Sequence, residues 1–310
     1  MSLGFMLADA GFDVWMGNSR GNTYSQRHIN LEISSDAFWS FSWDEMAAYD
    51  LPASIAHALA VSNASKLAYV GHSQGSTIGL AALASQPALA AKISVGVLMA
   101  PVMHLAHCSS VPLVLLAKTN SDTVARVLGV REFFPSQKAM SDLFGAACVT
   151  ESLACVGTIA SLLGCNWDNL DPERMPLFMS YMPSGTSMAD MEHWAQFIRQ
   201  PAPQFCRFDF GGECAGPLGH PKPCNTHAYG TLEPPLYDVA AIRTPLAFFS
   251  GGRDKVADAA DVRALAAALA PGMVVAAHEE PSYEHMDFCW GQNAHALVYP
   301  RVLDVLRSYA

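Results

Sequence analysis

One serine stands between a short apolar stretch and a helical pattern, with glycines close on both sides. The segment "GHSQG", residues 71–75, follows "LAYV" and leads into "GSTIGLAALAS". A nucleophile on such a sharp strand-to-helix turn has a strained backbone, so its neighbours must be small, as Gly71 and Gly75 are. The pattern predicts Ser73 as the nucleophile. It also predicts the backbone N–H of Gln74, at the helix N-terminus, as a donor to a developing oxyanion.

Two later segments supply the partners that a serine nucleophile needs. In this arrangement an acid follows a late strand and a histidine lies in a loop after the last strand. The segment "PLAFFSGGRDKVAD" offers Asp254, with Asp258 as the competitor that we expect to cap the next helix. The segment "EEPSYEHMDF" offers His285, with His278 as the alternative nearer the strand. We expect His285 to take the Ser73 proton and Asp254 to orient the imidazolium, so that an acyl-enzyme forms and is hydrolysed.

We expect a parallel sheet to position these groups. Short apolar stretches alternate with helical patterns along the chain. Such alternation predicts a sheet covered by helices on both faces. We expect strands at 12–16, 66–71, 93–99, 245–250 and 274–277, and helices at 2–10, 44–62, 74–85, 258–269 and 293–308. Asp44 is the expected N-cap of the helix 44–62, and Pro52 is expected to kink or restart that helix near Asp50.

The alternation stops between residues 104 and 243. That stretch is helical at first, then irregular and rich in proline, glycine and cysteine from 200 to 235. We therefore expect an α/β core made of residues 1–103 and 244–310, interrupted by an inserted, mainly helical cap at 104–243.

Composition limits the possible partners. The chain has 310 residues, of which 51% are hydrophobic and 15% charged, and this is typical of a globular protein with a large core. A formal net charge of -10 argues against nucleic-acid binding, which needs basic side chains to neutralise phosphates. No uninterrupted apolar run reaches the roughly 18 residues of a membrane span. The first 16 residues do not form a signal peptide, because they lack a basic start and contain Asp9 and Asp13.

The cysteines concentrate in one region. Six of the eight lie at Cys148, Cys155, Cys165, Cys206, Cys214 and Cys224. This clustering favours disulfides formed in an oxidising compartment, with ordinary small buried side chains as the alternative, and the pairing stays open. No CxxC pair is present, so we do not expect a structural zinc site.

The chain resembles the acid lipases, a family that includes the gastric and lysosomal enzymes of animals. The segments that carry the resemblance occur in the family's order: "LADAGFDVWMGNSRGNTYS", "FWSFSWDEMAAYDLPASI", "YVGHSQGST", "PSGTSMADMEHWAQ", "GGRDKVADAADV" and "YEHMDFCWG". The resemblance implies an α/β-hydrolase fold that cleaves acylglycerols or sterol esters at a lipid–water interface, without a metal or organic cofactor. It places Ser73, Asp254 and His285 on the family's triad, Gln74 on one oxyanion donor, and residues 104–243 on its cap and lid. It also implies secretion or a lysosomal lumen.

Two departures from the family give further expectations. The segment 206–229 is longer and richer in cysteine than the family's pattern, so bridges among Cys206, Cys214 and Cys224 are possible. The family usually has, before "SLGF", a signal peptide, the first strands of the sheet and a turn that supplies a second oxyanion N–H. We expect the sequence to be a truncated version, with the first strands missing and with weak or no hydrolysis by this 310-residue chain.

The sequence also allows functions other than lipid ester hydrolysis. An esterase of soluble short-chain esters has the same triad chemistry, and a non-catalytic lipid-binding remnant would keep the same fold. A peptidase is possible on this fold but has no positive feature here. The triplet "NAS" at Asn63 is a possible glycosylation site in a surface turn. Arg20 is expected to pair with a nearby acid in a structural role.

Overall fold

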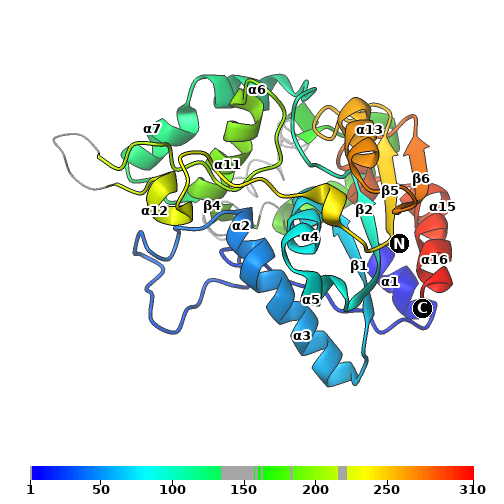
Figure 1. Ribbon diagram of the computed structural model, residues 1–310. Helices are drawn as coiled ribbons and strands as arrows, with labels where there is room; N and C mark the ends of the chain where they lie inside the picture. The colour runs from blue at the N-terminus through cyan, green and yellow to red at the C-terminus, as the bar shows by residue number, and fades with distance from the viewer. Residues whose placement is uncertain (1, 134–156, 158–159, 162, 182–183, 216–221) are drawn as a thin grey trace.

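The centre of the molecule is a four-stranded parallel sheet in the order β1-β2-β5-β6 (Figure 1). The computed structural model describes residues 2–133, 157, 160–161, 163–181, 184–215 and 222–310. The strands are β1 (Leu67–His72), β2 (Ile93–Met99), β5 (Leu246–Gly251) and β6 (Val274–Glu280). The inner strand β5 is buried along its whole length. Such continuous burial requires cover on both faces, and it explains why "LAFF" has no polar alternation.

Helices cover this sheet and bring the two ends of the described chain together. The helix α4 (Gln74–Ser85) packs against β1 and β2, α13 (Ala259–Ala268) against β5, and α16 (Tyr299–Ser308) against β2. The helix α1 (Leu3–Asp9) contacts α16, as Figure 1 also shows. The shorter helices of this part are α5 (Pro87–Ala90), η5 (Val239–Ala241), α14 (Asp287–Trp290) and α15 (Ala294–Leu297). The α/β-hydrolase class predicted from the sequence is therefore confirmed.

Most of the predicted elements are found within a few residues of their expected bounds, but the strand at 12–16 is wrong. These residues have no regular secondary structure. A strand is held by hydrogen bonds to a neighbour, and no strand among the described residues pairs with them. The Phe12 N–H instead donates to the carbonyl of Leu7 at the end of α1 (3.0 Å).

The expected N-cap at Asp44 is also wrong, since the helix begins at Trp43 and its N-cap is Ser42. The Ser42 side chain accepts the Asp44 N–H (3.1 Å), and the Glu45 carboxylate accepts the Ser42 N–H (2.7 Å), which forms a capping box. Asp44 is buried and accepts hydrogen bonds from elsewhere in the chain. The helix runs on as α2 (Trp43–Glu45), a π-helical turn η1 (Met46–Asp50) and α3 (Leu51–Ser62). It restarts after Asp50 with Pro52 in its first turn, as expected.

A mainly helical region lies between β2 and β5 in the sequence. Among its described residues the longest helix, α11 (Met188–Arg199), packs against α6 (Val111–Lys118) and α7 (Ser121–Val127), and the three gather on one side of the sheet (Figure 1). The smaller elements are β3 (Glu132–Phe133), η2 (Trp167–Asn169), η3 (Pro172–Arg174), α10 (Met175–Tyr181), β4 (Thr186–Ser187) and α12 (Asn225–Tyr229). The helical character of the insertion agrees with the sequence, while its exact bounds of 104 and 243 stay a prediction.

The described cysteines contain one disulfide, between Cys214 and Cys224. Cys206 and Cys165 are free and buried, so the alternative of ordinary buried side chains holds for these two. Cys148 and Cys155 lie outside the described residues.

Two minor motifs have clear positions. Arg20 forms a bidentate pair with Asp50, with its Nε 2.9 Å and one terminal nitrogen 2.6 Å from Oδ1, so its predicted structural role is supported. Asn63 ends α3 in a left-handed conformation (φ 52°) and is exposed. Its glycosylation stays a prediction.

Candidate active site

Ser73 lies on a strained turn between β1 and α4. Its backbone has φ 53° and ψ -120°, which is rare for a residue with a side chain. A Cβ at Gly71 would lie 2.7 Å from the carbonyl carbon of Gly75 and 2.9 Å from the nitrogen of Ser76. Only glycine fits there, so the first glycine of the motif exists to let the strand and the helix approach each other.

The structure brings the three predicted side chains into one hydrogen-bonded series. The Ser73 hydroxyl lies 2.7 Å from Nε2 of His285, and Nδ1 of His285 lies 2.8 Å from Oδ2 of Asp254. His285 is 1% exposed and Asp254 is 4% exposed. The three come from the ends of β1, β5 and β6, which meet at the same edge of a parallel sheet.

Asp254 is held as an ionised carboxylate. Its Oδ1 accepts the backbone N–H groups of Val256 and Ala257, each at 2.8 Å. Burial opposes the charge, but the neighbouring His285 and these N–H groups hold the pKa of Asp254 below its usual value. The ionised carboxylate therefore faces Nδ1 of His285, which fixes the proton on that nitrogen and leaves Nε2 to accept from Ser73.

Each of the two alternatives lies elsewhere. Asp258 caps α13, as expected, and accepts the Ala260 N–H at 2.7 Å. His278 lies inside β6, opposite Phe249, because the strand continues beyond its predicted end. Neither is bonded to Ser73 in the part of the chain that the structure describes.

Gln74 links the serine turn to the inserted region. It is the first residue of α4, so its N–H is one of the groups at the helix start that have no partner within the helix. Its side-chain oxygen accepts the indole N–H of Trp194 in α11 (2.7 Å). Nothing in the local sequence around Trp194 links it to Gln74, which is 120 positions away.

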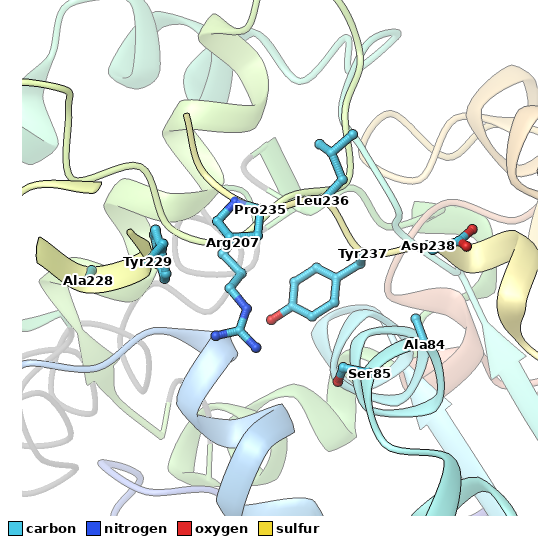
Figure 2. A pocket seen from close by; sticks show the side chains of 9 residues that line it. All are labelled: Ala84, Ser85, Arg207, Ala228, Tyr229, Pro235, Leu236, Tyr237 and Asp238. Carbon is cyan, nitrogen blue, oxygen red and sulfur yellow. The ribbon is translucent and has the colours of Figure 1, made fainter. Parts of the chain in front are cut away.

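Two open cavities lie beside the inserted region, away from Ser73. The larger, of about 460 Å³, is lined by Arg207, Tyr229 and Tyr237 together with Ser85 of α4 (Figure 2). The Arg207 guanidinium lies between the two tyrosine rings, 5.9 and 5.8 Å from their centroids. The second, of about 240 Å³, shares Arg207 and Tyr229. Neither cavity includes Ser73, Asp254 or His285, so neither is the place where the serine would act.

Among the described residues, no group of three or more His, Cys, Asp or Glu side chains could hold a metal ion.

Comparison with known proteins gives a consistent picture. Residues 4–292 match the family model described as alpha/beta hydrolase fold. Lysosomal acid lipase/cholesteryl ester hydrolase of Homo sapiens is 39% identical, and the match covers 99% of this chain and 74% of that protein. Gastric triacylglycerol lipase of Rattus norvegicus is 37% identical, with 98% of this chain and 74% of that protein covered.

Among solved structures, the monoacylglycerol lipase of Paleococcus ferrophilus superposes with a TM-score of 0.53 at 15% sequence identity. That superposition covers 99% of this chain and 88% of that chain. At this level of identity the likeness concerns the fold alone, and it agrees with the sheet and helices described above.

Proposed function

Since the chain belongs to the α/β-hydrolase family and, within it, to the acid lipases, we propose that it cleaves carboxylic esters of lipids through an acyl-enzyme on Ser73. Carboxylic ester hydrolysis follows from the family. The observation that carries the mechanism is the hydrogen-bonded series Ser73–His285–Asp254. The groups stand in the order that nucleophilic attack requires: the hydroxyl faces one imidazole nitrogen, and the carboxylate faces the other.

Acylation begins at the Ser73 hydroxyl. Nε2 of His285 removes the proton as the oxygen attacks the ester carbonyl, and the buried Asp254 carboxylate stabilises the imidazolium that forms. The carbonyl oxygen becomes an oxyanion beside the start of α4. There the Gln74 N–H and the positive end of the helix offset the charge. His285 then protonates the leaving alcohol, which leaves the acyl group on Ser73.

Deacylation repeats these steps with water. His285 takes a proton from a water molecule that attacks the acyl-enzyme, and it returns the proton to Ser73 when the carboxylic acid departs. No residue changes its net protonation over the cycle, so the set is ready for the next ester.

Exposed aliphatic side chains on α6 and α7 favour a lipid substrate. Val111 is 74% exposed, Leu115 61%, Val124 54% and Leu128 77%. Single exposed apolar residues are ordinary, but three on two packed helices of the inserted region and Leu128 directly after the second give an exposed apolar surface that suits contact with a lipid–water interface. This surface supports the lipase reading over an esterase of soluble substrates.

Two relatives are named as a lysosomal and a gastric lipase, and this supports a location of the protein in the lysosomal lumen or outside the cell. The Cys214–Cys224 disulfide is compatible with an oxidising compartment. None of the helices in the described part of the chain is long and apolar enough to cross a membrane.

The decisive experiment uses a fluorophosphonate, which forms a covalent bond with an activated serine. We expect the folded chain to be labelled at Ser73 and the Ser73→Ala variant to be unlabelled, with a Ser76→Ala variant as a control for reagent specificity. Absence of labelling in a folded sample would contradict the acyl-enzyme mechanism and favour the non-catalytic lipid-binding alternative.

A second comparison separates lipids from soluble esters. We expect faster hydrolysis of long-chain triacylglycerol or cholesteryl ester in emulsion than of short-chain esters below their solubility limit. The reverse order would favour the soluble esterase. Turnover by the 310-residue chain in the same assay measures the weak activity predicted from its sequence.

A further inference from the structure

The loop that carries His285, residues 281–286, lies between the main core and the inserted region. Tyr283 in this loop and Phe288 just after it are buried in the main hydrophobic core. Met286 and Trp290 belong instead to a second apolar cluster. The other buried members of that cluster come from the inserted region and are Ala160, Cys165, Leu170 and Met175. The residue directly after His285 therefore packs with the insertion rather than with the main core.

Asp287, the first residue of α14, joins the His285 loop to the inserted region through hydrogen bonds. It is fully buried. Its Oδ2 accepts the N–H of Glu284 at 2.7 Å and the N–H of Asn166 at 3.0 Å. Its Oδ1 accepts the side-chain amide of Asn169 at 2.8 Å. One carboxylate therefore ties the residue before His285 to two residues of the inserted region.

Two further hydrogen bonds reinforce this junction. The Met286 N–H donates to the carbonyl of Gly164 (3.0 Å). The side-chain amide of Asn166 donates to the carbonyl of Ser282 (3.2 Å). Residues 164 and 166 thus hold the His285 loop on both sides of the histidine. The mechanism proposed above assigns no role to these residues.

We propose that Asp287 is a positioning residue for His285. By fastening the His285 loop to residues 164–169, it makes the reaction of Ser73 depend on how the inserted region is docked. The effect on the reaction rests on the function proposed above, since it needs a reactive Ser73, whereas the fastening itself does not. In the described part of the chain no hydrogen bond joins the Asp287 side chain to Ser73, His285 or Asp254, so Asp287 acts through the backbone of the loop.

The position of His285 is critical because its ring makes two short contacts at once. Nε2 lies 2.7 Å from the Ser73 hydroxyl, and Nδ1 lies 2.8 Å from Oδ2 of Asp254. A displacement of about 1 Å can cost about a hundredfold in rate. The His285 loop has no helix or strand between β6 and α14, so its backbone is held by packing and by single hydrogen bonds.

Removal of the Asp287 carboxylate would affect this position directly. The N–H groups of Glu284 and Asn166 and the side-chain amide of Asn169 would lose their common acceptor. Buried donors without an acceptor cost free energy, and a shift of the loop or of the insertion toward water or another acceptor reduces that cost. Such a shift moves the backbone that carries His285.

The first experiment measures how fast a fluorophosphonate labels Ser73. Asp287→Leu keeps a side chain of similar size but has no acceptor, and we expect its labelling rate constant to fall at least about thirtyfold. Asp287→Asn keeps an oxygen for the two backbone N–H groups and should stay within about fivefold of wild type. A rate constant of Asp287→Leu within twofold of wild type would overturn the proposal.

The amplitude of labelling separates positioning from a general loss of structure. A variant that merely unfolds in part is labelled in a smaller fraction of molecules, but its folded molecules react at the wild-type rate. Asp122→Leu is the control, because it removes another buried carboxylate of the inserted region, which pairs with Arg199 at 2.9 Å. We expect its rate constant to stay within about twofold of wild type. An equal fall in Asp122→Leu and Asp287→Leu would overturn a specific role for Asp287.

A second variant tests the junction from the side of the insertion. Asn169→Ala removes the amide that donates to Asp287, and we expect the labelling rate constant to fall about fivefold. In a chain that already carries Asp287→Leu, the same change should alter the rate constant by less than about twofold, because the partner is gone. Fully additive losses would overturn the coupling. If Asp287→Leu does not fold, Asn169→Ala alone decides, and an unchanged rate constant overturns the proposal.

Hydrogen exchange measured by mass spectrometry distinguishes a failure of this proposal from a failure of the proposed function. Peptides that cover residues 164–170 and 282–290 should exchange at least about tenfold faster in Asp287→Leu than in wild type, whether or not the chain is active. Unchanged exchange would overturn the fastening even if Ser73 reacts. If wild-type Ser73 does not react at all, the proposed function and the effect on rate are both wrong, while faster exchange still supports the fastening.

Discussion

Two aspartates four positions apart have unrelated roles in this chain. Asp254 faces Nδ1 of His285 and accepts two backbone N–H groups, whereas the Asp258 side chain accepts the Ala260 N–H at the start of α13. Both stand in the same "GGRDKVAD" segment, and both were candidates for the triad acid. Asp254 lies in the loop after β5, whereas Asp258 is already the N-cap of α13.

Replacing Asp254 by Asn tests this assignment. The amide cannot stabilise the imidazolium and favours the wrong tautomer of His285, so we expect kcat for ester hydrolysis to fall by about 10,000-fold. Asp258→Asn is the matched control, because Asn caps helices as well as Asp does and should change kcat by less than about twofold. Steady-state kinetics on both variants, with circular dichroism to show folding, gives the comparison. A larger loss in Asp258→Asn would reverse the assignment.

The hydrogen-bonded arrangement of Ser73, His285 and Asp254 could be predicted from the sequence, and their catalytic roles stay a prediction. Each stands at the carboxyl end of an apolar strand, in the order that a serine hydrolase needs, and a short local motif identifies each one. Trp194 carried no such signal. Its partner Gln74 lies 120 positions away in the sequence, and only the packed fold brings the two together.

At the scale of elements, the turn between β1 and α4 depends on contacts too tight for a side chain. The neighbours of a Cβ at Gly71 are backbone atoms, which cannot move aside as a flexible side chain can. At Gly75, by contrast, the nearest atom would be the Tyr69 hydroxyl at 3.7 Å, an ordinary contact. The two glycines of one motif therefore tolerate substitution differently.

Gly71→Ala should destabilise the fold by about 3 kcal/mol, since overpacking against rigid neighbours costs 1–3 kcal/mol or more. Gly75→Ala should change stability by less than about 1 kcal/mol, because it introduces no close contact and stands in a helix. Urea unfolding measures both. Equal destabilisation by the two substitutions would show that the close approach at Gly71 is not what holds the turn.

Element prediction failed where an element depends on a partner. Residues 12–16 have the apolar character of a strand, yet a strand needs a neighbour for its hydrogen bonds, and local sequence does not report one. Asp44 has the side chain of a helix cap, yet its carboxylate accepts from the Phe208 N–H and the Tyr237 hydroxyl instead. These contacts come from more than 160 residues away.

The hydrogen bond from Trp194 to Gln74 joins α11 to α4, and Trp194→Phe removes it while keeping an aromatic ring. A lost hydrogen bond of this kind costs about 1 kcal/mol. If this bond holds the backbone N–H of Gln74 in place as the oxyanion donor, we expect kcat/KM to fall about fivefold. Trp167→Phe is the control, because Trp167 lies in the inserted region and is 50% exposed. Equal kinetic effects in the two variants would contradict a positioning role for Trp194.

At the scale of the whole molecule, buried carboxyl groups in the inserted region and in α2 make stability depend on pH. Asp190 of α11 is fully buried, and its side chain accepts from Thr186 at 2.9 Å. Burial raises its pKa from 3.8 to about 7. Asp44 is 8% exposed, and burial raises its pKa to about 6. His193, also in α11, stays neutral, because burial lowers its pKa to about 3.

The sign of the Asp190 effect follows from linkage. Between about pH 4 and 7 the folded state holds a proton on Asp190 that the unfolded state has released, so this group's contribution to stability falls as pH rises. Asp190→Asn removes that dependence. We expect the free energy of unfolding of the variant, relative to wild type, to rise by about 2.6 kcal/mol from pH 5 to 8, at about 1.4 kcal/mol per pKa unit.

Denaturant unfolding at several pH values measures this difference, and Asp304→Asn on the surface of α16 is the control. A constant difference between Asp190→Asn and wild type across the range would mean that Asp190 is ionised in the folded state.

The pairing of β2 with β5 has a consequence for how the chain folds. Gly96 lies opposite Leu246, so the two inner strands meet only after a loop of about 150 residues has closed. Closing a loop adds entropy cost only slowly with length, but contacts between distant residues slow folding markedly. The strands β5 and β6, by contrast, are joined through α13 alone and can pair early. Refolding should therefore be slow, with the join between β2 and β5 forming late, after the inserted helices have drawn the two parts of the sheet together.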